Sequence, residues 1–138
     1  MKYIYIILAI VSFTSCNDMK IGYLEAEKGF FSPNILEIKK NLDPIEDKKR
    51  IEQEIPWVSY PIQGVQGTLP IRYELIGATE KEGGSTSELL NNAFMRGDGA
   101  LEINYKNNIP LGEYKLDIKI SNEGYSHTLK AALTIKVK

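Results

Sequence analysis

Apolar and charged residues alternate most regularly between positions 113 and 120. One face carries apolar side chains, at Tyr114, Leu116, Ile118 and Ile120. The positions between them are acidic or basic, which is typical of an antiparallel strand that buries one side. A second run repeats the pattern, at Leu129, Ala131, Leu133, Ile135 and Val137. Asn122 and Gly124 between the runs suit a tight turn, so the pattern predicts a hairpin at the C-terminal end.

Shorter alternating runs predict further strands. Residues 71–75 and 101–105 alternate clearly, and residues 35–39 and 51–59 do so more weakly, with Pro56 pushing the last one toward an edge or a bulge. Residues 41–50 are too charged for a core strand and are predicted to form a loop. The chain is therefore expected to be all-β, with about seven strands in two packed antiparallel sheets.

One segment of the C-terminal half favours a helical turn over a strand. Ser85 and Glu88 have the spacing of a capping box and follow the Gly83-Gly84 pair. We expect one short helical turn here.

The first sixteen residues have the order of a bacterial leader. Lys2 precedes an apolar run at residues 3–13, which is shorter than the ~20 residues needed to span a bilayer. Small polar residues then precede Cys16, a pattern that resembles the lipobox of bacterial lipoproteins. The resemblance implies cleavage before Cys16 and acylation of its thiol, for example by palmitate. The alternative is that Cys16 is an incidental residue of an uncleaved anchor or an ordinary secretory leader.

This interpretation divides the chain into three parts. Residues 1–15 are expected to be a signal peptide, residues 16–22 the lipidated cysteine with a short tether, and residues 23–138 one β-sandwich domain. Composition fits a folded domain, since 43% of the residues are apolar and 25% are charged. The 17 basic residues do not exceed the 18 acidic ones, so nucleic acid is not an expected partner. With a single cysteine, neither an internal disulfide nor a cysteine-based metal site is expected.

Residues 69–138 resemble a cadherin-like or immunoglobulin-like bacterial module. The resemblance lies in five segments, at residues 71–75, 93–94, 97–101, 111–116 and 133–137. With its leader and the segments 57–59 and 64–71, the chain is also similar to small Bacteroidetes lipoproteins that accompany glycan-uptake systems. That similarity implies an outer-membrane location and a role in carbohydrate capture. It leaves open which membrane face the domain occupies.

Candidate catalytic groups are sparse. His127 is the only histidine and is expected to lie at the exposed end of a hairpin rather than in a catalytic triad. Asp43, Glu46 and Asp47 could hold a hard cation, but the adjacent basic residues favour a solvated charged loop. Asp98 lies between two glycines and is interpreted as a turn residue. We therefore expect no enzyme activity, no metal and no cofactor.

Aromatic residues are the candidate ligand contacts. Tyr73 and Tyr114 fall on apolar strand faces and are predicted to pack in the core. Trp57 and Tyr60 are bracketed by Pro56 and Pro61 and could form a platform for a sugar face. The alternative for Trp57 is that it fills the core of a small sandwich.

Two functions follow from these observations. The first is a membrane-anchored, non-enzymatic binding or accessory module, with Cys16 as the lipid attachment site, Trp57 and Tyr60 as ligand contacts, and a polysaccharide as the partner. The second is a structural protein that docks onto a larger outer-membrane complex through a sheet edge.

Overall fold

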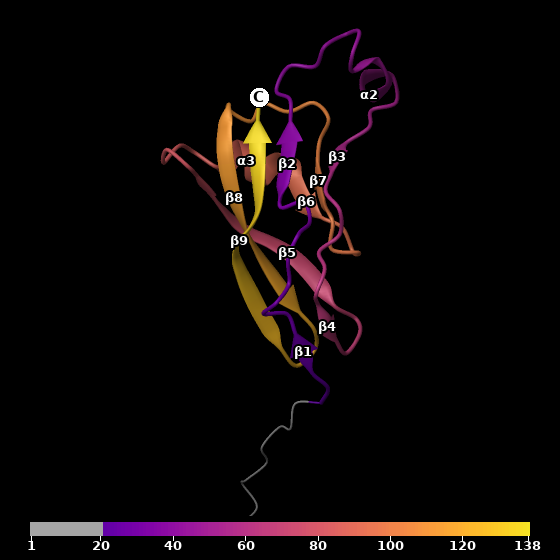
Figure 1. Cartoon of the computed structure of the whole chain (residues 1–138), viewed down its shortest axis with the longest axis vertical. Helices are drawn as coiled ribbons and strands as arrows, with labels where there is room; N and C mark the ends of the chain where they lie inside the picture. Colours follow the sequence, from indigo (N-terminus) through magenta and orange to yellow (C-terminus); the bar gives the residue numbers. More distant parts are fainter. Residues whose placement is uncertain (1–20) are drawn as a thin grey trace, which may run out of the picture.

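The computed structural model describes residues 21–138, and Cys16 and the predicted leader lie outside the described residues. Strands dominate this part of the chain (Figure 1). They are β1 (Leu24–Glu25), β2 (Ile35–Ile38), β3 (Trp57–Val58), β4 (Gln66–Gly67), β5 (Arg72–Glu80), β6 (Ala93–Met95), β7 (Leu101–Ile103), β8 (Gly112–Ser121) and β9 (Ser126–Val137). Two short helices accompany them, α2 (Lys48–Glu52) and α3 (Ser87–Asn92). The all-β prediction is confirmed.

The strands form three sheets. The largest has the order β2-β9-β8-β5, the second has the order β3-β7-β6, and β1 pairs with β4 alone. All pairs are antiparallel except β2 with β9, which run parallel.

The predicted C-terminal hairpin is present as β8 and β9. The apolar face of β8 is buried at all four positions expected from the sequence, and Asn122 orders the turn by accepting hydrogen bonds from the N–H groups of Gly124 and Tyr125. Full burial of each such side chain contributes about 1.5–3 kcal/mol to stability. This hairpin is therefore the main support of the largest sheet.

The alternation predicted for β9 is wrong at one position. Ala131 was expected on the apolar face, but it is exposed and has a φ of 50°. Between the pairs Leu116–Leu133 and Ile118–Leu129, β8 has one residue and β9 has three, so β9 bulges. The carboxylate of Asp117 accepts a hydrogen bond from the Ala131 N–H at 2.9 Å and stabilises the bulge. Because two residues are added, Leu133 and the positions after it still face the core.

Residues of the four-stranded and three-stranded sheets share one apolar cluster. Its largest fully buried side chains are Tyr114, Ile38, Leu89, Leu101, Ile103, Ile109, Leu116, Ile118, Ile120, Leu133 and Ile135. The Tyr114 hydroxyl, at the start of β8, donates a 2.8 Å hydrogen bond to the Pro110 carbonyl. Burial, with a smaller contribution from Glu80, raises the pKa of Tyr114 above its ordinary value, which keeps this donor protonated. Tyr73 packs against the same cluster, so the core positions predicted for both tyrosines are confirmed.

The weaker sequence patterns are borne out unevenly. The strands predicted at 35–39, 71–75 and 101–105 are present as β2, β5 and β7. The strand predicted at 51–59 is wrong at its start, because Ile51 and Glu52 belong to α2 and a turn follows them, and only Trp57–Val58 forms a strand, β3.

The helical turn predicted near residue 85 is present as α3. It begins at Ser87, whose N–H donates a 3.4 Å hydrogen bond to the Ser85 hydroxyl, while the N-cap residue Thr86 makes no side-chain cap hydrogen bond. The capping-box pattern therefore located the helix, although the reciprocal bonds between Ser85 and Glu88 do not form.

The first and last described residues lie at opposite ends of an elongated molecule. Figure 1 places β1 and the turn between β8 and β9 at the end where residue 21 lies. It places α2 and the C-terminus at the opposite end. The loops that follow β2 and β7 also reach this second end.

Candidate functional site

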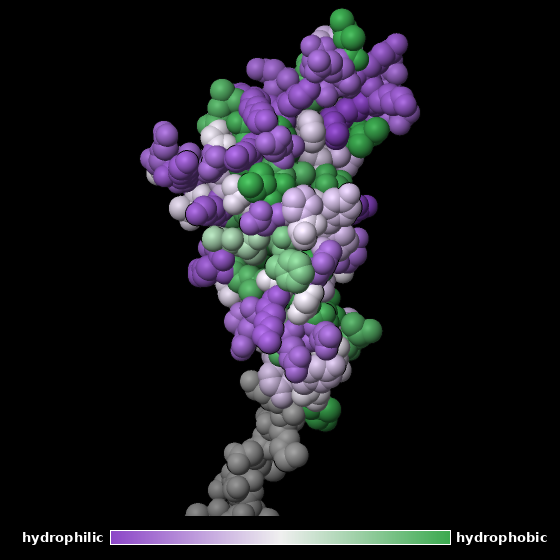
Figure 2. Space-filling view, in the orientation of Figure 1, coloured by the Kyte–Doolittle hydropathy of each residue, from purple (hydrophilic) through white to green (hydrophobic). Residues whose placement is uncertain are grey.

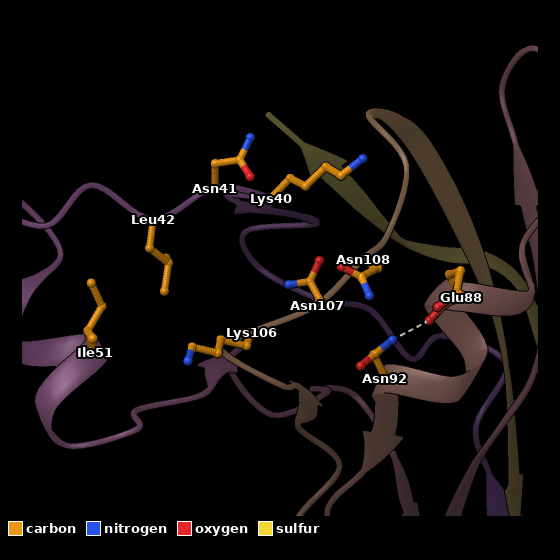
Figure 3. Close-up of a pocket in the computed structure, with 9 residues that line it drawn as sticks. All are labelled: Lys40, Asn41, Leu42, Ile51, Glu88, Asn92, Lys106, Asn107 and Asn108. Carbon is orange, nitrogen blue, oxygen red and sulfur yellow. Dashed lines mark hydrogen bonds between the residues drawn. The ribbon is translucent and has the colours of Figure 1, made fainter.

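A cleft of about 700 Å³ lies near the end of the molecule that carries α2. Three segments far apart in the sequence form it, as Figure 3 shows. Its lining residues are Lys40, Asn41, Leu42, Ile51, Glu88, Asn92, Lys106, Asn107 and Asn108. Because amide side chains are the commonest of these, we call it the asparagine cleft.

The loop after β7 forms one side of the asparagine cleft. Asn107 stabilises this loop in two ways, since its amide donates to the Asn104 carbonyl and its side-chain oxygen accepts from the Ile109 N–H, both at 3.3 Å. Ile109 is fully buried and anchors the end of the loop in the core. The position of Asn108 between these two anchored residues is therefore well determined.

Helix α3 forms the adjacent side. Leu89 of α3 is fully buried, which fastens the helix to the core. The Asn92 amide donates a 2.7 Å hydrogen bond to the Glu88 carbonyl, and its oxygen accepts a 3.3 Å bond from Asn104 (Figure 3). Asn92 is thus largely occupied within the protein, whereas the Glu88 carboxylate forms no ion pair or hydrogen bond with any residue between 21 and 138.

The third side is the segment from Lys39 to Pro56, which two sets of contacts hold in place. At one point, Lys39 forms ion pairs with Asp47 at 3.0 Å and with Glu46 at 3.5 Å. At the other, the Arg50 guanidinium lies 3.6 Å from the centre of the Trp57 ring and donates to the carbonyls of residues 55 and 56, each at 2.9 Å. These contacts hold Asn41 and Ile51 in place at the rim.

The acidic residues Asp43, Glu46 and Asp47, predicted to lie in a solvated charged loop, help to hold this segment in place. The N–H groups of Glu46 and Ile45 donate to Asp43 and hold the pKa of its carboxyl below the ordinary value. The Asp43 N–H, followed by Lys39, lowers the pKa of Asp47 in the same way. Asp47 in turn raises the pKa of Lys39. These carboxylates are thus committed to backbone and lysine donors.

Several polar groups in the asparagine cleft remain available to a ligand. Within residues 21–138, the side chains of Lys40, Asn41 and Asn108 form no hydrogen bond or ion pair. An amide offers two donors and two acceptor lone pairs, which suits the mixed donor and acceptor character of sugar hydroxyls. Among the described lining residues, Glu88 is the one acidic residue. The free amides of the asparagine cleft are therefore its main hydrogen-bonding groups for a ligand.

The two aromatic candidates lie in different environments. The Trp57 ring is half-buried, packs against the core cluster and is covered by Arg50. Its Nε1 is buried and has no hydrogen-bond partner among the described residues. Tyr60 is 66% exposed and follows Ser59, whose buried hydroxyl accepts a bond from the Leu101 N–H. The structure does not place either residue among those that line the asparagine cleft.

The other candidates from the sequence have structural surroundings of their own. Asp98 lies in the turn between β6 and β7 and accepts a hydrogen bond from the Ala100 N–H, as its interpretation as a turn residue requires. His127 lies near the start of β9, opposite Ile120. Among residues 21–138, no group of three or more potential ligands is placed to hold a metal ion. Over the same range, no helix has the length and apolarity needed to cross a membrane.

The asparagine cleft was not identified from the sequence. A signal was present, because three of the five residues from Asn104 to Asn108 are asparagines. Such a run is more often interpreted as turn-forming, and nothing in it indicates that α3 and the segment after β2 lie beside it.

Comparison of the chain with protein-family models, curated proteins and solved structures finds no match.

Proposed function

We propose that this chain is a lipid-anchored, non-enzymatic binding protein of the outer membrane, and that it captures glycans in the asparagine cleft. In this proposal the leader ends before Cys16 and the acylated Cys16 holds the domain at the membrane. The observation that carries the glycan assignment is the set of uncommitted amide groups, Asn41 and Asn108, on a rim with well-determined positions.

The position of the cleft also supports the proposal. Residue 21 lies at one end of the molecule, and α2 and the loop after β7, which line the asparagine cleft, lie toward the other (Figure 1). A tether that starts at Cys16 would therefore hold the cleft facing away from the lipid. This arrangement suits capture of a ligand from the surrounding medium.

We further propose that the domain is an immunoglobulin-like sandwich of the cadherin-like kind. Two sheets with the orders β2-β9-β8-β5 and β3-β7-β6 match a seven-stranded immunoglobulin-like arrangement with a parallel first strand. The Tyr114 hydroxyl bonded to the carbonyl four residues upstream resembles the tyrosine corner of such domains. Loops at the ends of these sandwiches are common binding sites, which agrees with the place of the asparagine cleft.

Docking through a sheet edge is the alternative function, and the structure supports it less. In the described chain, β5 pairs only with β8 and so forms one edge of the largest sheet. That edge is interrupted by a bulge near Ile76, and it exposes Arg72 and Glu74. Bulges and exposed charges are the devices that discourage edge pairing.

Glycan-array and affinity-gel measurements would test the proposal. A chain that starts at Ile21 keeps every residue of the core cluster, which runs from Ala26 to Val137. We expect this chain to be retained by at least one polysaccharide. Absence of retention by every polysaccharide tested, together with a protein partner recovered in stoichiometric amount, would favour the docking alternative.

Paired variants would locate the binding site. If each amide contributes about 1 kcal/mol, the double variant N41A/N108A should weaken binding about 30-fold. Asn91→Ala is the matched control, because Asn91 is exposed on α3 but does not line the cleft. Tyr60→Ala tests the aromatic contact predicted from the sequence. Loss of retention in Tyr60→Ala but not in N41A/N108A would move the site away from the asparagine cleft.

Mass spectrometry of the protein from its native host would test the anchor. We expect a mature chain that begins at an acylated Cys16. An intact leader or an unmodified thiol would contradict this part of the proposal.

A further inference from the structure

Three exposed apolar side chains lie where the described chain begins. Ile21 is 88% exposed, Tyr23 is 52% exposed and Leu69 is 80% exposed. In Figure 2, apolar surface is visible at this end of the molecule, whereas the opposite end is mostly hydrophilic. We call these three residues the apolar tip.

Hydrogen bonds join the two segments that carry the apolar tip. The Thr68 N–H donates to the Tyr23 carbonyl at 3.0 Å, and the Tyr23 N–H donates to the Thr68 hydroxyl at 3.1 Å. The Asn122 amide, from the turn between β8 and β9, donates to the carbonyls of both residues, at 2.8 and 3.2 Å. Leu69 follows Thr68 directly, so these hydrogen bonds hold the two segments that carry the exposed apolar side chains at the same end of the molecule.

The chain that precedes the apolar tip indicates what covers it. Only four residues separate Cys16 from Ile21, and at about 3.4 Å per residue this segment reaches about 17 Å. If Cys16 is acylated, the tip cannot move far from the lipid. Aliphatic side chains gain free energy when they enter the headgroup region, and tyrosine favours the same depth because its ring is apolar and its hydroxyl is polar.

We propose that the apolar tip inserts into the lipid surface to which the protein is anchored, and that it orients the domain so that the asparagine cleft points away from the membrane. This inference rests on the proposed function, since it requires the lipid on Cys16. Glu25, Glu123 and Arg72 are exposed near the same end. These charges do not favour anionic lipids, because the two acidic residues outweigh the basic one.

A fluorescent probe at the tip would test the inference. Full-length lipidated protein carrying Leu69→Trp is reconstituted into phosphatidylcholine vesicles with brominated acyl chains, which quench tryptophan within the bilayer. The matched control is Ile45→Trp, because Ile45 is 86% exposed in the segment before α2, at the opposite end. Trp57 is present in both variants and contributes the same background.

After subtraction of the Trp57 emission measured in the unsubstituted protein, we expect the emission of Leu69→Trp to lie at shorter wavelength than that of Ile45→Trp and to fall at least twofold in brominated vesicles, and the emission of Ile45→Trp to stay unchanged. Addition of phosphatidylglycerol should not increase the quenching. Equal emission from the two variants, in protein that co-floats with the vesicles, would overturn the insertion of the tip and leave the anchor intact. Protein that fails to co-float would instead contradict the anchor, and the inference would fall with it.

Discussion

The hydrogen bond from Tyr114 to Pro110 allows a quantitative test of how the start of β8 is stabilised. Tyr114 is 1% exposed, and its hydroxyl donates to the Pro110 carbonyl at 2.8 Å. Tyr114→Phe removes only that hydroxyl and leaves the carbonyl without its donor. A lost bond of this kind costs about 1–2 kcal/mol. For a domain of this size, the cost corresponds to a fall in Tm of about 4–8 °C.

The assay is urea and thermal denaturation of the chain that starts at Ile21, followed by circular dichroism. Tyr73→Phe is the matched control, because Tyr73 also packs against the core but its hydroxyl forms no hydrogen bond with another described residue. The control should change the free energy of unfolding by less than about 0.5 kcal/mol. Both variants should keep the urea m-value of the parent chain. Equal midpoints for the two variants would refute the assigned role of the Tyr114 hydroxyl.

Two further tests concern the backbone and the acidic loop. Gly99→Ala should destabilise the domain by about 1–3 kcal/mol in urea denaturation, because Gly99 has a φ of 87° and an added Cβ would lie 2.6 Å from Ile62 Cγ2. Gly97→Ala is the control and should have little effect, because its added Cβ would meet no atom within 4 Å. The pKa values of Asp43 and Asp47 are lowered, so their stabilisation of the loop is present above the ordinary value of 3.8 and is lost as the pH falls through the lowered values. The protection factors of the backbone amides bonded to these carboxylates should therefore fall in acid, relative to those of amides without such a bond. Protection factors that do not change with pH would contradict the role of the two carboxylates.

The sequence predicts an element of the fold reliably where a residue pattern has a single physical cause. The face of β8 that carries Leu116 and Ile118 repeats with a period of two because a strand exposes its sides alternately. Ala131 could not be placed in the same way. Its exposure depends on a bulge that Asp117 stabilises from the neighbouring strand, and the spacing within β9 carries no sign of that contact.

The sequence contains the residues of the candidate site but does not indicate that they lie close together. Asn41, Asn92 and Asn108 are far apart in the sequence and become neighbours only through the packing of α3 and two loops. Trp57 illustrates the opposite difficulty. Flanking prolines indicated an exposed segment, but Arg50, in a segment predicted as a loop, folds into α2 and covers the ring. Propensity describes neighbours along the chain, and both outcomes depended on contacts across it.

The two sets of contacts that hold the segment from Lys39 to Pro56 have a consequence for ligand binding. Lys39 with Asp47 at one point, and Arg50 with Trp57 at the other, restrict this wall before any ligand arrives. Its loss of conformational entropy belongs to folding, so association would require little additional ordering there. If the proposed glycan binding is right, the affinity for each oligosaccharide should depend mainly on the contacts that it forms with this wall.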